Sequence, residues 1–363
     1  MSDQDLEAWL RQMPGADHPF PTSPERLYSP ADLYRGFDPS RAGTLKDSFD
    51  ARVARWLAPF GPPRRLGIAE TIAARLHDTA IDRLVAAFVL DRMPSVGLMG
   101  SHSISRADPA FLQFALIARA LHRQGFLVIS GGGPGLMEAA NFGALVAPCA
   151  DEVLDEALEM LKQAPVYQDG EDWVRTAALA RAFILQRTPG ADPDASWISE
   201  TPENGRSLGL PTWYYGSESP NLFASHVGKY FFNSLREDGL VGVATGGIVF
   251  GMGEAGTVQE IFQSASLNYY RPPGKAATPM VFVGKDYWSP RGDRPSASAA
   301  VSRLAKPAAQ LVQAMASQSQ APFQDAVSIH DSVEGVVDEI VRANRCADAP
   351  GHIAKARLAA AER

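Results

Sequence analysis

Cysteine is scarce in this chain, and its two cysteines, Cys149 and Cys346, lie far apart in the sequence. Neither has a histidine or a second cysteine at the spacing of metal ligands, so the sequence supports neither a zinc site nor a disulfide framework. We therefore expect both thiols to be structural or incidental, and we expect no metal ion.

Long apolar runs and an excess of positive charge are also missing. No run approaches the roughly 18 apolar residues of a membrane-spanning helix, although 45% of the residues are hydrophobic. The N-terminus has neither the basic region nor the apolar core of a signal peptide, which favours a cytoplasmic location. The net charge of −7 argues against a nucleic acid or an anionic membrane as partner, because both attract basic surfaces.

Short apolar runs alternate with helical patterns over most of the chain. The runs predict strands at 96–101, 126–130, 210–215, 240–245 with 248–250, 279–284 and 326–330. The apolar periodicity predicts helices at 48–57, 68–91, 110–124, 136–146, 153–164, 173–186, 221–238, 257–270, 296–316 and 331–344. Strands that alternate with helices favour a doubly wound, Rossmann-like α/β fold, with about six parallel strands and helices on both faces.

Composition divides the chain into three parts. Residues 1–92 are predicted to form an N-terminal arm that ends in a long helix, and 93–345 the Rossmann-like domain. Within that domain, a helical insertion at about 150–205 is either a lid over the sheet or a surface excursion. Residues 346–363 form an Ala- and Arg-rich tail that we expect to be helical.

Two glycine-rich turns each follow a predicted strand and open a predicted helix. The first contains Gly131, Gly132, Gly133 and Gly135, and the second contains Gly251, Gly253 and Gly256, followed by Thr257. Such turns leave backbone N–H groups without partners at the positive end of a helix dipole, where a phosphate binds well. Two of them predict a phosphate-bearing ligand held between the ends of neighbouring strands.

The second turn also spells a dinucleotide-binding fingerprint, because Gly251, Gly253 and Gly256 have the G-x-G-x-x-G spacing. The acidic residue expected about 20 residues further on is not in place, since Asp286 lies 30 residues beyond Gly256. The fingerprint also normally follows the first strand of the sheet. A nicotinamide-dependent oxidoreductase is therefore the weaker alternative.

The two turns, together with Gly100 and Ser101, resemble the LOG (LONELY GUY) family of Rossmann-like nucleotide-processing proteins, formerly labelled lysine decarboxylases. The resemblance covers roughly 94–345 except for the insertion, and 210–216 is similar to a divergent bacterial branch. It implies a homodimer that cleaves the N-glycosidic bond of a nucleoside 5′-monophosphate, giving free base and ribose 5-phosphate without a cofactor. No segment resembles a pyridoxal-phosphate lysine site, so decarboxylation is not expected.

The resemblance assigns roles to residues of the second turn. Gly253, Gly256 and Thr257 would hold the 5′-phosphate, and Glu260 occupies the position of the catalytic glutamate, beside the ribose. An alternative for Glu260 is purely structural, because the segment that starts at Thr257 also matches a capping box in which Glu260 bonds back to the cap residue.

Two more positions carry ligand-site predictions with open alternatives. Ser101, which follows Gly100 at the end of the first strand, matches a small hydroxylic residue that lies near the ligand in the family. Glu138, one turn into the helix after the first glycine turn, would contact a ribose hydroxyl, or is a first-turn acid that the helix dipole favours.

One departure from the family pattern bears on catalysis. The family carries a His-x-Arg-Lys run whose arginine is catalytic, and here Gly228 stands at that arginine's place, between His226 and Lys229. On the predicted helix His226 and Lys229 share one face, where Lys229 would replace the missing positive charge, or both belong to an ordinary polar face. The loss, together with Met252 at the place of a family proline, keeps a second hypothesis open: a non-catalytic nucleotide sensor.

Overall fold

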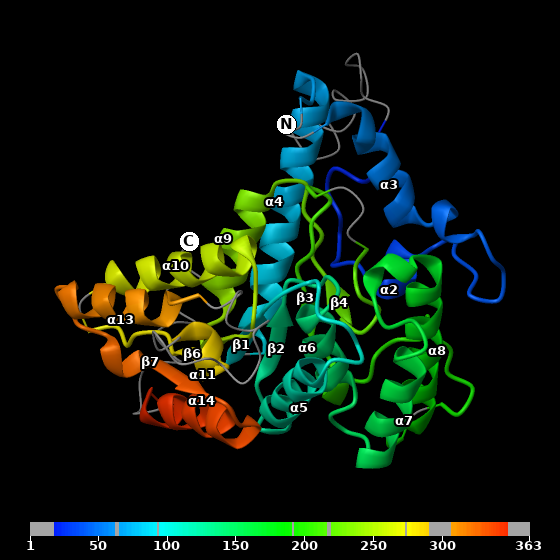
Figure 1. Cartoon of the computed structure of the whole chain (residues 1–363). Helices are drawn as coiled ribbons and strands as arrows, with labels where there is room; N and C mark the ends of the chain where they lie inside the picture. The colour runs from blue at the N-terminus through cyan, green and yellow to red at the C-terminus, as the bar shows by residue number, and fades with distance from the viewer. Residues whose placement is uncertain are drawn as a thin grey trace.

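The computed structural model describes residues 18–61, 65–92, 94–190, 192–215, 219–272, 274–289 and 306–347. Seven strands form one sheet in the order β4-β3-β2-β1-β5-β6-β7, and every neighbouring pair is parallel (Figure 1). The strands are β1 Ser95–Met99, β2 Leu127–Ser130, β3 Leu208–Gly209, β4 His226–Val227, β5 Gly247–Phe250, β6 Met280–Val283 and β7 Val327–His330. The predicted Rossmann-like fold is confirmed, with one more strand than expected.

Helices cover both faces of this sheet. One layer contains α5 Pro109–Arg123, α6 Leu136–Leu145 and α14 Val333–Ala347, and the other contains α4 Ile68–Leu90, α9 Asn233–Val243, α10 Ala255–Tyr269 and α13 Ala308–Gln318 (Figure 1). The strands β1, β2, β5 and β6 between them are entirely buried, as their apolar runs predict for a parallel sheet, whereas three of the four residues of the edge strand β7 are half-buried. The short helix α11, Lys285–Trp288, follows β6.

The N-terminal arm closes one edge of the sheet. Its helices are α2 Pro30–Leu33, α3 Phe49–Leu57 and α4, and the bounds of α3 and α4 agree closely with those predicted. Just before α2, Tyr28 pairs antiparallel with Val227 of β4 through two backbone hydrogen bonds, of 3.0 and 2.7 Å. The arm thus occupies backbone groups that an open edge strand would expose.

The predicted insertion contains two helices, α7 Asp151–Leu161 and α8 Glu171–Arg187, which pack against each other. Both lie close to their predicted positions. In Figure 1 they stand beside α6, at the end of the sheet away from β7.

The segment between the insertion and β5 differs from its prediction. The helix expected at 221–238 is wrong, because His226–Val227 is strand β4 and the helix α9 begins only at Asn233. Of the two segments expected to form or flank a strand, 248–250 lies in β5, whereas 240–245 forms the end of α9 and the turn after it. Backbone pairing decides the first case: the amides of Val227 and Gly228 donate to carbonyls of the arm and of β3.

Other expectations are settled in part. The strand expected at 210–215 is wrong: β3 is Leu208–Gly209, and within the expected range only Thr212 forms an isolated bridge, with Tyr230. The first half of the helix expected at 296–316 lies outside the described residues, and α13 covers the second half. The tail beyond Ala347 also lies outside them. Among the described helices, none combines the length and the apolar character needed to cross a membrane.

Candidate functional site

The glycine-rich turns meet at the carboxyl ends of three neighbouring strands, β2, β1 and β5. The chain runs from β1 outward to β2 on one side and later returns to place β5 on the other side. This is the point where the strand order reverses, and doubly wound sheets bind their ligands in the crevice outside it. The fold therefore brings together the two turns that the sequence places about 120 residues apart.

Backbone hydrogen bonds join these three strand ends. The amide of Leu136 donates to the carbonyl of Ser101 over 3.0 Å, and the amide of Ser101 donates to the carbonyl of Met252 over 2.8 Å. A Cβ atom on either Gly100 or Gly251 would come within 2.6 Å of the Leu136 side chain. Glycine is therefore required at both positions, because Leu136 fills the space between the two strands.

The first turn is held by buried asparagines. The backbone N–H of Asn221 donates to the carbonyl of Gly132 over 2.8 Å. Its side-chain Nδ2 donates to the carbonyl of Gly133 and to Oδ1 of Asn141. Gly132 has φ +72° and Gly135 has φ +66°, so both adopt backbone conformations that other residues rarely take. The turn is thus rigid before any ligand arrives, which lowers the entropic cost of binding.

The second turn opens the helix α10 without a side-chain cap. Its N-cap residue is Glu254, so Thr257 is the third residue of the helix, and the predicted capping box between Thr257 and Glu260 is wrong. The Tyr287 hydroxyl donates to the Gly253 carbonyl over 2.7 Å and accepts from its amide over 3.3 Å.

The first amides of α10 remain available to a ligand. Within the described residues, the backbone N–H groups of Ala255, Gly256 and Thr257 have no hydrogen-bond acceptor. They lie at the positive end of a 15-residue helix, the arrangement that favours an anion. A Cβ atom on Gly253 would collide with the Thr257 side chain, so this glycine allows the helix to start close to the strand.

Glu260 forms an ion pair that sequence reasoning missed. Nη1 of Arg236 on α9 donates to its Oε1 over 2.9 Å, and both side chains are about nine-tenths buried. The same guanidinium lies against the first turn, since a Cβ atom on Gly131 would be 3.8 Å from its Nη1. Its Nε is buried and has no acceptor among the described residues. A cation and a carboxylate are therefore placed between the two glycine turns.

Gly228 and Lys229 lie elsewhere. A Cβ atom on Gly228 would come within 3.0 Å of Ile81, Val85 and Leu210, so this position is packed beneath α4 and has no room for an arginine. The Lys229 Nζ lies 2.6 Å from a carboxylate oxygen of Asp50 in the N-terminal arm, and its side chain is 1% exposed. A role of Lys229 in catalysis thus stays a prediction, and its observed ion partner belongs to the arm.

His226 is the first residue of β4 and so lies at the end of the sheet where the parallel strands begin. The glycine turns lie at the opposite end, where the strands finish. The prediction that it shares a helix face with Lys229 is wrong. Its ring packs on Phe88, with centroids 4.3 Å apart. Burial lowers the pKa of His226 to about 4, and the nearby Arg206 and Arg92 contribute further. The folded protein therefore holds this imidazole neutral.

Glu138 is fully buried and paired. Nε and Nη2 of Arg106 donate to its two carboxylate oxygens over 2.9 and 2.5 Å. Arg106 also donates to the carbonyl of Ala164 over 3.0 Å and to that of Trp173 over 3.1 Å, in and beside the two helices of the insertion. Glu138 therefore anchors the insertion to the helix that follows the first glycine turn.

At the end of β1, the Ser101 and Ser103 hydroxyls lie 2.7 Å apart.

Within the described residues, no group of three or more His, Cys, Asp or Glu side chains is placed to hold a metal ion. No protein-family model matches the chain, and no curated protein matches it. Any function proposed for this site is therefore argued from its residues and from the motif resemblance.

Proposed function

We propose that this protein binds a nucleoside 5′-monophosphate, or a related phosphoribosyl compound, at its glycine turns and hydrolyses the N-glycosidic bond. The pairing of Arg236 with Glu260 between the two turns is the observation that carries this proposal. A phosphate-binding helix start, a carboxylate and a guanidinium are the groups that this reaction needs, and all three lie in or beside the two glycine turns.

The 5′-phosphate would bind at the start of α10. The amides of Ala255, Gly256 and Thr257 supply three donors, and the helix dipole favours the negative charge. No lysine is required, which is consistent with a protein whose net charge is −7. The ribose would then extend from the phosphate toward Glu260, one turn further along the same helix.

Glu260 would act on the sugar. As the bond between C1′ and the base nitrogen breaks, the bonding electrons leave with the base and positive charge develops on the ribose ring. A carboxylate beside the ring stabilises that charge and accepts a proton from the attacking water. The water oxygen bonds to C1′, and the departing base receives a proton, so one water molecule is consumed for each base and ribose 5-phosphate formed.

Arg236 would supply the guanidinium that the resemblance places at Gly228. Its hydrogen bond fixes the direction of the Glu260 carboxylate, and its buried Nε, which has no acceptor among the described residues, is a further donor. Gly228, whose place in the family pattern favours a non-catalytic sensor, is packed in the core. We keep a cytoplasmic location and a homodimer as predictions, the latter testable by light scattering.

The first experiment incubates the purified protein with a panel of nucleoside 5′-monophosphates and separates the products by chromatography. We expect equimolar free base and ribose 5-phosphate from at least one of them. The matching nucleosides, which lack the phosphate, are the control and should react far more slowly. Thermal stabilisation by the nucleotides without base release would instead favour the sensor. If the nucleotides neither release base nor stabilise the protein, both functions are excluded.

A pair of arginine variants tests the role of Arg236. Arg236→Lys keeps the charge but loses the planar guanidinium, so kcat should fall by roughly tenfold or more while KM changes little. Arg83→Lys, on the exposed surface of α4, is the matched control. A rise in KM alone would mean that Arg236 binds the substrate without orienting Glu260.

A further inference from the structure

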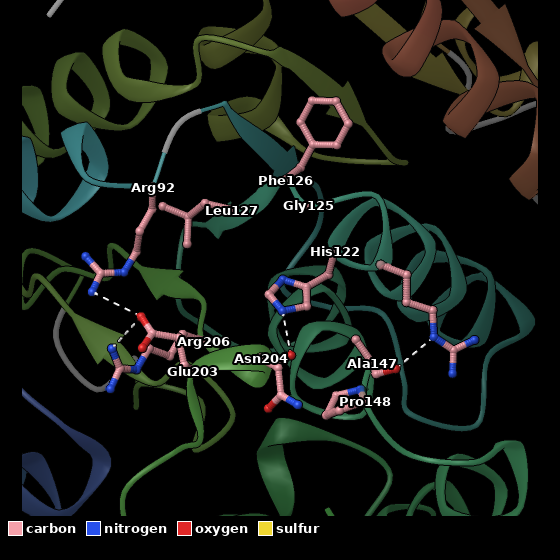
Figure 2. A pocket seen from close by; sticks show the side chains of 11 residues that line it. Arg92, His122, Gly125, Phe126, Leu127, Ala147, Pro148, Glu203, Asn204 and Arg206 are labelled. Carbon is pink, nitrogen blue, oxygen red and sulfur yellow. Dashed lines mark hydrogen bonds and ion pairs between the residues drawn. The ribbon is translucent and has the colours of Figure 1, made fainter. Parts of the chain in front are cut away.

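A cavity of about 480 Å³ lies at the opposite edge of the sheet, where the chain enters β1, β2 and β3. Its wall is formed by the end of α5, the segment before β2 and the short turn Glu203–Gly205 before β3 (Figure 2). Because all strands are parallel, this edge is separated from the glycine turns by the length of the strands. The cavity therefore forms a site of its own.

The cavity is positively charged in a protein that is acidic as a whole. Arg92, Arg123 and Arg206 line it together with one acid, Glu203, which leaves a charge of 3 − 1 = +2. His122, which also lines it, adds none at neutral pH, since burial lowers its pKa. An excess of guanidinium groups around one cavity favours an anionic ligand.

Two of these arginines have incomplete hydrogen bonding. The Nε atoms of Arg92 and Arg206 are buried, and neither has an acceptor among the described residues. A buried donor without an acceptor costs free energy, so a ligand oxygen that reaches it gains more than an exposed contact would. The Arg92 and Arg206 side chains come from two different segments, and both point toward Glu203, as Figure 2 shows.

The acid between them is weakly held. Glu203 lies 3.1 Å from Nη1 of Arg206 and 3.8 Å from Nη2 of Arg92, and its side chain is 78% exposed. Exposed ion pairs contribute little stability. A stronger anion can therefore take the place of the Glu203 carboxylate between the two guanidinium groups.

Most of the remaining wall is apolar, apart from Asn204. Phe126, Leu127, Ala147 and Pro148 line the cavity beside the arginines. A ligand that fits has a compact, doubly charged group at one end and an apolar or ring portion at the other. A phosphate monoester dianion matches the charge of +2, and its oxygens match the forked geometry of arginine.

We propose that this cavity is a second binding site, which takes the phosphate group of a small organic phosphate by displacing Glu203 from Arg92 and Arg206. The site does not depend on the chemistry at the glycine turns. Its place at the amino ends of β1 and β2, in a sheet whose carboxyl ends carry the glycine turns, makes it suited to an effector rather than a substrate.

Isothermal titration calorimetry with inorganic pyrophosphate tests the proposal. Arg92→Met and Arg206→Met keep the aliphatic stems and remove the donors, so each should weaken binding by at least about tenfold. Glu203→Gln removes the competing charge and should strengthen binding several-fold. Arg83→Met, on the exposed surface of α4, removes the same charge elsewhere and should leave the affinity unchanged.

A further variant separates this site from the glycine turns. Arg236→Ala alters the other site and should leave the affinity of this cavity for pyrophosphate at its wild-type value. Absence of binding by the wild-type protein at millimolar pyrophosphate would overturn the proposal. So would unchanged affinity in both methionine variants, or the loss of all binding in Arg236→Ala alone.

Discussion

The ion pair between Arg106 and Glu138 predicts that Glu138 is a structural residue. In Glu138→Gln the amide nitrogen replaces a carboxylate oxygen and faces an arginine N–H, so one donor meets another. The Arg106 charge, 1% exposed, then lacks its counter-charge. Breaking a buried pair on one side costs about 3–5 kcal/mol, which corresponds to a fall in Tm of roughly 5–15 °C for a protein of this size.

The assay is thermal unfolding of the wild type, Glu138→Gln, Arg106→Met and the double variant. Because the two side chains bond to each other, the double variant should lose at least about 1 kcal/mol less than the sum of the single losses. Glu156→Gln, an exposed carboxylate on α7, is the control and should not change Tm. Wild-type stability in Glu138→Gln together with weaker nucleotide binding would refute the argument and assign Glu138 to the ligand.

Three further predictions concern Gly228, Lys229 and His226, which lie away from the glycine turns. Gly228→Ala should cost about 1–3 kcal/mol in urea unfolding through overpacking, with no change in the rate of base release. Lys229→Met should destabilise by about 3 kcal/mol, because it leaves the buried Asp50 without this cation; a lower rate at wild-type stability would instead support a catalytic lysine. The pKa of His226 is about 4 in the folded protein and 6.5 in the unfolded chain, so the unfolded state binds more protons between these values. Stability should therefore be lost as the pH falls from 6.5 toward 4, by about 1–2 kcal/mol after solvent screening, and His226→Phe should abolish that part of the urea-midpoint profile.

The fold was largely predictable because its signals are local. Buried parallel strands such as β1, β2 and β6 read as continuous apolar runs, and α4 shows its periodicity over more than twenty residues. The two-residue strands β3 and β4 were misplaced because their pairing depends on partners distant in sequence. In β4 one such partner is Tyr28, almost 200 residues earlier.

Only the part of the candidate site that consists of glycine-rich turns could be predicted from the sequence. The turns after β2 and β5 carry a backbone signal, whereas Arg236 has no motif of its own in the sequence. A helix at 221–238 puts His226 and Lys229 on one face, and so points to Lys229 rather than to Arg236 as the cation of the site. Had α9 been placed at its true start, Asn233, Arg236 would have been recognised as the basic residue of the helix that leads into β5.

The most direct test of the central claim is the single-turnover rate of base release by Glu260→Gln, measured with the best nucleotide of the panel. The substitution keeps the size of the side chain and removes its charge. We predict that the rate falls by at least about 100-fold while nucleotide affinity and Tm stay within a small factor of wild type. A rate close to wild type in this variant would contradict the account, because the Glu260 carboxylate would then take no part in the reaction.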